Sequence, residues 1–203
     1  MSAQQTDIRL IVGLGNPGTQ YEQTRHNAGY WLLDEIASRY GCILKPESKF
    51  AAEVGRATIN GTQVYLCKSV KYMNESGQSV APLMNFYKIE PQQCLVIHDE
   101  LDLPPGHARI KHGGGHGGHN GLRDIAARTG SKDFWRVRIG IGHPGHKNAV
   151  SGYVLKRASA DDQRLIDEAI DIVLREFDGI AGGDINAAMK TIHSHKPPES
   201  QSG

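Results

Sequence analysis

IRLIVGLGNPGTQYEQTRHNAGYWLLDEIASRYG, residues 8–41, decides the fold class because it carries a strand, a loop and a helix in that order. Residues 8–12 form an apolar run that ends at a glycine, which is typical of a buried strand. From residue 27 to residue 40 the apolar side chains recur at helical spacing, and Gly41 is a suitable stop. A strand that leads through a loop into a helix predicts an α/β domain.

The rest of the chain continues this alternation of strands and helices. The apolar patterns and the hairpin signal Asn60-Gly61 predict strands at 50–59, 62–68, 94–97, 107–111 and 134–141. Helical spacing predicts helices at 75–87 (where Pro82 weakens the case for continuity), 122–129, 161–177 and 184–192. We expect a single α/β domain over residues 8–193, with a mixed central β-sheet flanked by helices on both faces. Residues 1–7 are expected to be a loose N-terminus, and residues 194–203 a disordered tail.

The composition is typical of one globular domain in a reducing compartment. The chain has 203 residues, of which 38% are hydrophobic and 22% charged, and this excludes a disordered chain. Its net charge of +1 excludes a protein that coats nucleic acid, so any contact with nucleic acid must use a local patch. Cys42, Cys67 and Cys94 are expected to be thiols rather than disulfide partners. With no signal-peptide pattern and no apolar run of membrane length, we expect a cytoplasmic protein.

The sequence GLGNPG at residues 13–18 matches the G-x-G-x-x-G pattern of dinucleotide-binding proteins. In those proteins the helix begins inside the motif, so that its N-terminus holds the pyrophosphate. Here helical spacing begins only near residue 27, and Asp34 and Glu35 lie on that helix instead of at the end of a second strand. We prefer a turn that presents the Asn16 amide at the carboxyl end of a strand, where α/β proteins bind ligands.

Several histidines lie in or near the glycine-rich sequence KHGGGHGGHNG, residues 111–121. His112, His116 and His119, with His98 nearby, could suggest a metal site, but glycines give such ligands no rigid scaffold and no HExxH motif occurs. We interpret His112 and His116 as solvated residues of a flexible loop. His119 and Asn120 differ because they stand at the expected start of a helix, where Asn can cap the helix or face a ligand.

Two other patterns do not decide the function. GQSVA at residues 77–81 is close to the nucleophile elbow of serine hydrolases, but it lies within helical spacing rather than between a strand and a helix, so we reject it. Arg136 and Arg138 share one face of a predicted strand, and Arg109 and Lys111 alternate on another. These charges fit a solvated sheet face and a phosphate-binding patch equally well.

Five motifs in a fixed order resemble the bacterial-type peptidyl-tRNA hydrolase family. They cover residues 8–155 and are GLGNPGTQYEQTRHNAGYW, MNESG, HDELDLPPG, KHGGGHGGHNGLRDI and RVRIGIGHPG. The resemblance implies a single α/β domain with a mixed sheet, in agreement with the apolar patterns. It also implies hydrolysis of the ester between peptide and tRNA in peptidyl-tRNA, which recycles tRNA from prematurely released chains. We therefore expect peptidyl-tRNA as the partner, no cofactor, no metal, no membrane association and a monomer.

The resemblance also implies roles for individual residues. His26 matches the catalytic base that activates the attacking water, and Asp99 matches its carboxylate partner. The positions that match the substrate-binding set are Asn16, Tyr21, Tyr72, Asn74, His119 and Asn120. The positions that match a tRNA phosphate clamp are Lys111, Arg138 and Lys147. At position 72 the family more often has phenylalanine, and the added hydroxyl should be tolerated at the rim of a cleft.

These residue types suit the expected chemistry. Histidine, with an ordinary pKa of about 6.5, is largely neutral at pH 7, as a general base must be. A neighbouring carboxylate would hold its tautomer, and asparagine amides can stabilise an oxyanion or bind a peptide without attracting a free ammonium group. The main alternative is an RNA-binding relative without hydrolase activity. The complete set of His26, Asp99, Asn16, Asn74 and Asn120 favours the enzyme.

Overall fold

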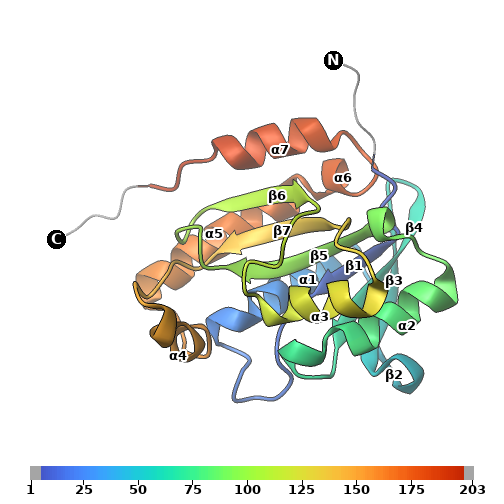
Figure 1. Ribbon diagram of the computed structural model, residues 1–203. Helices are drawn as coiled ribbons and strands as arrows, with labels where there is room; N and C mark the ends of the chain where they lie inside the picture. The colour runs from blue at the N-terminus through green and yellow to red at the C-terminus, as the bar shows by residue number, and fades with distance from the viewer. Residues whose placement is uncertain (1–5, 199–203) are drawn as a thin grey trace.

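A seven-stranded mixed sheet in the order β2-β3-β4-β1-β5-β7-β6 forms the centre of the computed structural model, which describes residues 6–198 (Figure 1). Its strands are β1 Leu10–Gly13, β2 Lys45–Glu47, β3 Ala52–Ile59, β4 Thr62–Ser69, β5 Cys94–Glu100, β6 Ala108–His112 and β7 Trp135–Gly140. The helices are α1 Ala28–Arg39, α2 Gly77–Tyr87, α3 Asn120–Thr129, α4 Val150–Val154, α5 Ala160–Arg175, α6 Phe177–Ile180 and α7 Ile185–Ser194.

Four neighbouring strands in the middle of the sheet run parallel. These are β4, β1, β5 and β7, whereas β3 is antiparallel to both β2 and β4, and β6 is antiparallel to β7. The carboxyl ends of the four parallel strands therefore meet at one edge of the sheet. Loops that follow such strands are where α/β proteins bind ligands.

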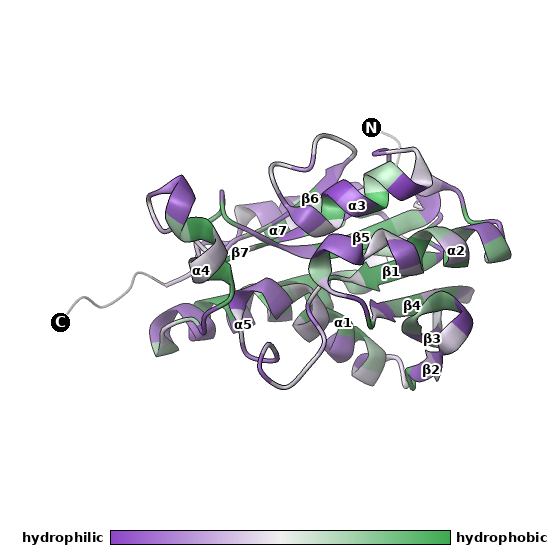
Figure 2. Cartoon of the chain, turned by 60° about the horizontal axis from the view of Figure 1, so that its bottom comes forward, coloured by the Kyte–Doolittle hydropathy of each residue, from purple (hydrophilic) through white to green (hydrophobic). Residues whose placement is uncertain are grey.

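Helices cover both faces of the sheet, as the sequence predicts. On β1, Ile11 packs in a core cluster with Leu33 of α1 and Val173 of α5, while its neighbour Val12 packs in a second cluster with Leu83 of α2 and Ile125 of α3. Successive side chains of a strand point to opposite faces, so one strand contributes to both clusters. Figure 2 shows the central strands as mostly hydrophobic and the outer surfaces of α3 and α5 as mostly hydrophilic.

The predicted hairpin is confirmed, with Ile59 opposite Thr62 across the turn. Asn60 and Gly61 have positive φ angles of 50° and 75°, the left-handed conformation that a two-residue hairpin turn of this kind requires. The predicted helix at 75–87 is continuous through Pro82 as α2.

Both ends of the domain extend further than the sequence predicts. Thr6, expected in a loose N-terminus, is buried, donates to Ile180 O at 2.5 Å and accepts from Gly182 N at 3.0 Å. At the other end, the ring of His195 lies 3.2 Å from Glu168, and Pro197 packs against Gly106. The expected loose and disordered ends are thus wrong for these residues, because long-range contacts hold them. Residues 1–5 and 199–203 lie outside the described residues.

Cys42, Cys67 and Cys94 are buried and carry free thiols, as expected. Within residues 6–198, no helix has both the length and the apolar character needed to cross a bilayer.

Candidate active site

A cavity of about 660 Å³ opens at the edge of the sheet where the parallel strands end. Its walls come from the loops after β1, β4, β5 and β7, from the N-terminus of α3 and from α4. The predicted site residues that line it are Asn16, Tyr21, His26, Asn74, Asp99, His119, Asn120 and Lys147. Residues separated by more than a hundred positions in sequence thus share one cavity.

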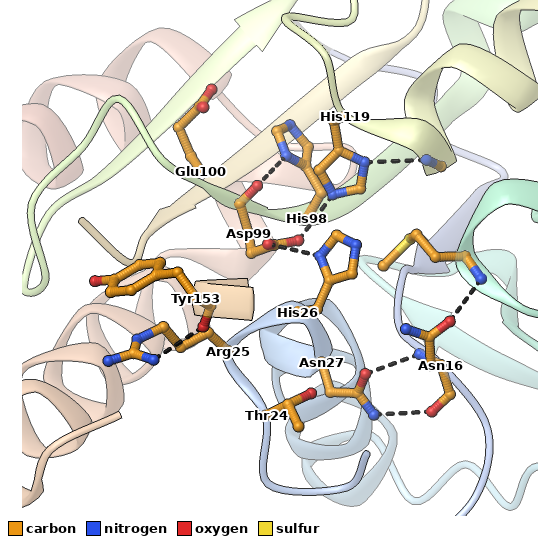
Figure 3. A network of polar contacts seen from close by, with 12 residues as sticks. Asn16, Thr24, Arg25, His26, Asn27, His98, Asp99, Glu100, His119 and Tyr153 are labelled. Atoms are coloured by element: carbon orange, nitrogen blue, oxygen red, sulfur yellow. Dashed lines mark hydrogen bonds and ion pairs between the residues drawn. The ribbon is translucent and has the colours of Figure 1, made fainter. Parts of the chain in front are cut away.

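His26 and Asp99 are in direct contact at this edge. His26 lies in η1 (Arg25–Asn27), which leads into α1, and its Nδ1 is 2.8 Å from Oδ2 of Asp99 near the end of β5. Gly29 makes this approach possible, because a Cβ there would lie 2.4 Å from Ile97 O and 2.5 Å from Leu14 O. An ionised carboxylate only accepts hydrogen bonds, so Nδ1 of His26 carries the proton and Nε2 keeps its lone pair. Figure 3 shows Nε2 turned away from Asp99.

His119 supplies a second N–H donor to the same carboxylate. It is the N-cap of α3, and its Nδ1 accepts from the backbone N–H groups of Gly121 at 3.2 Å and Leu122 at 3.4 Å. Because Nδ1 is an acceptor, the proton of a neutral ring is on Nε2, which donates to Oδ1 of Asp99 at 2.8 Å. Asp99 therefore lies between two imidazoles, with one oxygen for each (Figure 3).

The protonation of His26 and Asp99 follows from this arrangement. Burial lowers the pKa of His26, but the charge of Asp99 and its hydrogen bond act the other way, and the net result is a pKa above 6.5. Burial raises the pKa of Asp99, whereas the charges and hydrogen bonds of His26 and His119 lower it, and the net shift is downward. Asp99 is therefore ionised at neutral pH although it is only 3% exposed.

His98 supports Asp99 from within the sheet. Its Nδ1 donates to the backbone carbonyl of Asp99 at 2.8 Å, and its ring meets that of His119 edge-on at 5.1 Å between centroids. Burial and the neighbouring His119 lower the pKa of His98 to about 3. His98 is thus a neutral structural residue rather than a second base.

Asn16 is fixed with its amide NH₂ group toward the cavity. Its Oδ1 accepts from Met73 N at 2.7 Å, which leaves Nδ2 as the outward group. Its backbone is held by Asn27, whose Oδ1 accepts from Asn16 N at 2.8 Å and whose Nδ2 donates to Asn16 O at 3.0 Å (Figure 3). The position of this donor is therefore set before any ligand binds.

The other predicted substrate-binding residues surround this centre. Asn74 and Asn120 are exposed side chains that line the cavity. The ring of Tyr21, which also lines it, meets the ring of Tyr72 edge-on with centroids 6.3 Å apart. Tyr72 itself is 54% exposed and forms an aromatic pair with Tyr21 at the surface. The site thus combines one buried and two exposed amides with an exposed aromatic pair.

Within residues 6–198, one group of side chains could hold a metal ion, and it consists of His26, Asp99 and His119. The donor atoms of His26, Asp99 and His119 lie within 4.8 Å of one another. Two of the nitrogens are already hydrogen-bonded to the carboxylate at 2.8 Å. A metal bound through these same two nitrogens would have to replace both hydrogen bonds.

Comparisons with known proteins identify the family. A family model described as peptidyl-tRNA hydrolase matches residues 10–200. The chain belongs to the peptidyl-tRNA hydrolase family. A curated peptidyl-tRNA hydrolase from Idiomarina loihiensis is 50% identical over 194 residues, which cover 96% of this chain and 98% of that protein. The one from Neisseria meningitidis is 51% identical over 187 residues, which cover 92% of this chain and 97% of that protein. A crystal structure of the Acinetobacter baumannii enzyme is 50% identical, with a TM-score of 0.92 over 97% of this chain and 100% of the other.

Membership of the peptidyl-tRNA hydrolase family confirms the resemblance seen in the sequence and makes the chain a hydrolase. The expected fold is confirmed as well, because the central sheet is mixed and the Acinetobacter baumannii enzyme has a similar fold over 97% of this chain.

The basic residues predicted to form a clamp do not all face the cavity. Lys147, in η5 (Lys147–Ala149), lines it, whereas Lys111 is exposed on β6 and Arg138 lies on the adjacent strand β7. Nε of Arg138 is 2.8 Å from Oε1 of Glu100, so Arg138 forms an ion pair. The sequence allowed two interpretations of Arg136, a residue of a solvated sheet face or part of a phosphate-binding patch. In the structure Arg136 is buried, and it donates to backbone carbonyls of the glycine-rich loop.

Sequence reasoning missed Arg25 and Asn27, whose side chains hold the backbone of residues around the cavity, and it left the role of Arg136 open. No local signal marks Arg25, because its partners Tyr153 O and Lys156 O are 128 and 131 positions away. Asn27 binds the backbone of Asn16, 11 positions away across a loop whose path the sequence does not specify.

The structure places His112 at the end of β6 and not in the flexible loop that the sequence predicted, whereas His116 lies in the loop. His112 packs beside Trp135 with ring centroids 4.9 Å apart, and His116 accepts from Gly118 N at 2.9 Å, so both make local contacts.

Proposed function

We propose that this chain hydrolyses the ester bond between peptide and tRNA in peptidyl-tRNA, with His26 as the general base. The observation that carries the proposal is the 2.8 Å contact between His26 Nδ1 and Asp99 Oδ2, which leaves Nε2 of His26 as a free base at the cavity. The hydrolase names of the relatives support the substrate. Such an activity would recycle tRNA from prematurely released peptidyl-tRNA.

The reaction needs a water that attacks the ester carbonyl carbon. Nε2 of His26 takes a proton from this water as the oxygen–carbon bond forms, and Asp99 stabilises the imidazolium that results. The tetrahedral intermediate then loses the ribose oxygen, which receives the proton back from His26. The products are a peptide with a free carboxylate and a tRNA with a free terminal hydroxyl.

Amide groups suit the remaining tasks. Nδ2 of Asn16 is a fixed donor suited to the oxyanion, and one donor of this kind contributes roughly 3 kcal/mol to transition-state stabilisation. Asn74 and Asn120 can bind the peptide amide, which has no charge, without attracting the ammonium group of free aminoacyl-tRNA. Tyr21 and Tyr72 offer aromatic faces to the part of the substrate that enters at the surface.

Binding of the tRNA backbone is assigned to the clamp of Lys111, Arg138 and Lys147. Because the chain has a net charge of only +1, a local cluster rather than the whole surface must attract the phosphates. Arg138 is held by Glu100 at 2.8 Å, so it offers phosphates only the part of its guanidinium that Glu100 leaves free. We further propose that the enzyme works as a cytoplasmic monomer without metal or cofactor.

Release of the blocked amino acid from N-acetyl-aminoacyl-tRNA tests the activity, with unblocked aminoacyl-tRNA as the comparison. We expect hydrolysis of the first and little of the second. H26A should abolish turnover while tRNA affinity stays close to that of the unmodified protein, and a chelator should leave the rate unchanged. Equal loss of turnover and affinity in H26A would refute the assignment of the base.

A further inference from the structure

Arg25, the residue just before His26, is a buried cation held by backbone carbonyls. It is 8% exposed, and within residues 6–198 no carboxylate forms an ion pair with it. Burying a charge is costly unless hydrogen bonds replace the lost water. The hydrogen bonds of the buried Arg25 side chain therefore have to offset this cost, and their partners indicate what the residue holds in place.

The contacts of Arg25 all lead to the segment that contains α4. Its Nη1 donates to Tyr153 O at 2.9 Å and to Lys156 O at 3.3 Å, and its backbone N donates to Lys156 O at 3.0 Å. The guanidinium lies flat over the ring of Tyr153, 3.8 Å from its centre (Figure 3). Only a planar guanidinium can stack on a ring and bind two carbonyls at once.

The helix α4 depends on such anchors. It has five residues, Val150–Val154, and a helix this short is not stable without tertiary contacts. Besides Arg25, the hydroxyl of Tyr153 donates to Ile141 O at 2.6 Å, beyond the end of β7, and Val154 is buried in the core. Arg25 is thus the anchor that joins α4 to the segment of the catalytic base.

This anchor matters for the cavity because α4 forms one of its walls. Val150, Ser151, Val154 and Leu155 line the cavity, and Lys147 lines it from the turn that leads into α4. His26 lines the cavity from the segment that Arg25 belongs to. The contacts of Arg25 therefore set how far this wall stands from the base.

We propose that Arg25 is a positioning residue that holds α4 as a substrate-binding wall and acts on substrate affinity rather than on the chemical step. This inference rests on the proposed function, because it concerns the same site. The pairing of His26 with Asp99 involves no atom of the Arg25 side chain, so the base keeps its geometry when that side chain is changed. Interactions that bind ground state and transition state equally affect KM and leave kcat unchanged.

The test compares R25M, R25K and Y153L in the full chain, with N-acetyl-aminoacyl-tRNA as substrate over a range of pH. We expect KM to rise about tenfold in R25M, and by less in R25K, because a lysine keeps the charge and a donor but has no planar group to stack on the ring. KM should also rise in Y153L, because the stacking partner and the hydroxyl bond to Ile141 O are lost. The value of kcat should stay within about twofold, and the pH dependence of kcat should not move. R157M, which removes an exposed guanidinium nearby in the chain, is the matched control and should leave KM unchanged.

A purely structural role gives a different result. Partial unfolding lowers the concentration of active enzyme, so the apparent kcat falls while KM stays the same, and this outcome would overturn the proposal. A fall in kcat together with a displaced pH profile would also overturn it, because Arg25 would then act through His26. If R25M does not fold, R25K and Y153L decide, and an unchanged KM in both refutes the role. Inactivity of the unmodified protein would instead refute the proposed function itself.

Discussion

The hydrogen bond between His119 Nε2 and Asp99 Oδ1, 2.8 Å long, leaves the other carboxylate oxygen for His26. The helix α3 fixes the direction of this bond, because the cap that His119 provides occupies Nδ1 and puts the proton on Nε2. His119 therefore reduces the basicity of the carboxylate that faces His26. Through this bond the start of α3 influences His26, which lies in the turn that leads into α1.

His119→Asn tests this influence on the base. Asn is a favourable N-cap, so α3 should keep its start, but the shorter side chain no longer reaches Asp99. The carboxylate then interacts more strongly with His26 and raises its pKa further. We expect the acidic limb of the kcat/KM profile to move to higher pH and the maximal rate to fall roughly tenfold, as for other supporting residues. If the acidic limb stayed in place while circular dichroism showed an intact helix, the result would contradict an influence of His119 on the pKa of His26.

Asp99→Asn should move the same limb in the opposite direction. Without the carboxylate charge, burial alone acts on His26 and lowers its pKa, so the neutral fraction persists to lower pH. The rate at the plateau should nevertheless fall at least about 100-fold, because the tautomer of His26 is no longer fixed. Profiles of kcat/KM for both variants provide the measurement. If the acidic limb moved in the same direction in both variants, the result would contradict a carboxylate shared by His26 and His119.

Asn16→Asp tests the amide donor in the cavity. Aspartate has the same shape, and one of its oxygens can still accept from Met73 N–H, but the other now presents an acceptor where Nδ2 was a donor. We expect kcat to fall about 100- to 1,000-fold in the variant that is still folded at the assay temperature, although the buried carboxylate lowers its thermal stability. The measurement is single-turnover hydrolysis beside a melting curve. A rate close to that of the unmodified protein would show that the Asn16 amide does not stabilise the transition state.

The sequence predicted the central elements of the fold because their apolar spacing is regular. The helix at 161–177 and the hairpin at Asn60-Gly61 correspond to α5 and to the β3–β4 turn. It missed β2, whose three residues are all exposed at the edge of the sheet and include a proline. It also ended the strand at 94–97 too early, because His98, Asp99 and Glu100 are polar although two of them are buried in β5.

The candidate site was predicted by residue type rather than by contact. Motifs pointed to His26, Asp99 and Asn16, and the structure brings them to one cavity. The partners that fix them could not be predicted, because Asn16 is held by Met73, 57 positions away, and Arg25 by Tyr153, 128 positions away. Such pairs depend on the sheet order, which apolar spacing does not specify.

The exposed lysines of the proposed clamp should govern the salt dependence of tRNA binding. K111M and K147M each remove one positive charge from an exposed side chain. If each contacts a phosphate, the slope of log affinity against log salt should become shallower by about one per lysine, with kcat largely unchanged. K190M, which removes the charge of an exposed lysine on α7, is the control and should leave the slope unchanged. Identical slopes in all three variants would refute the clamp.

Burial of neutral His98 should make the fold sensitive to acid. In the unfolded chain His98 takes up a proton below about pH 6.5, whereas in the folded chain it does so only near pH 3, because burial lowers its pKa to about 3. The unfolded state therefore binds more protons between these values, and the free energy of unfolding decreases as pH falls, by up to about 1.4 kcal/mol per unit from this group.

H98N cannot titrate, and its amide can still donate to the Asp99 carbonyl. Urea unfolding at pH 7.5, 6 and 5 should show a smaller decrease in H98N than in the unmodified protein. Because the shorter side chain also leaves a gap that costs stability at every pH, the slopes and not the absolute values decide, and parallel slopes would show that His98 does not cause the acid sensitivity.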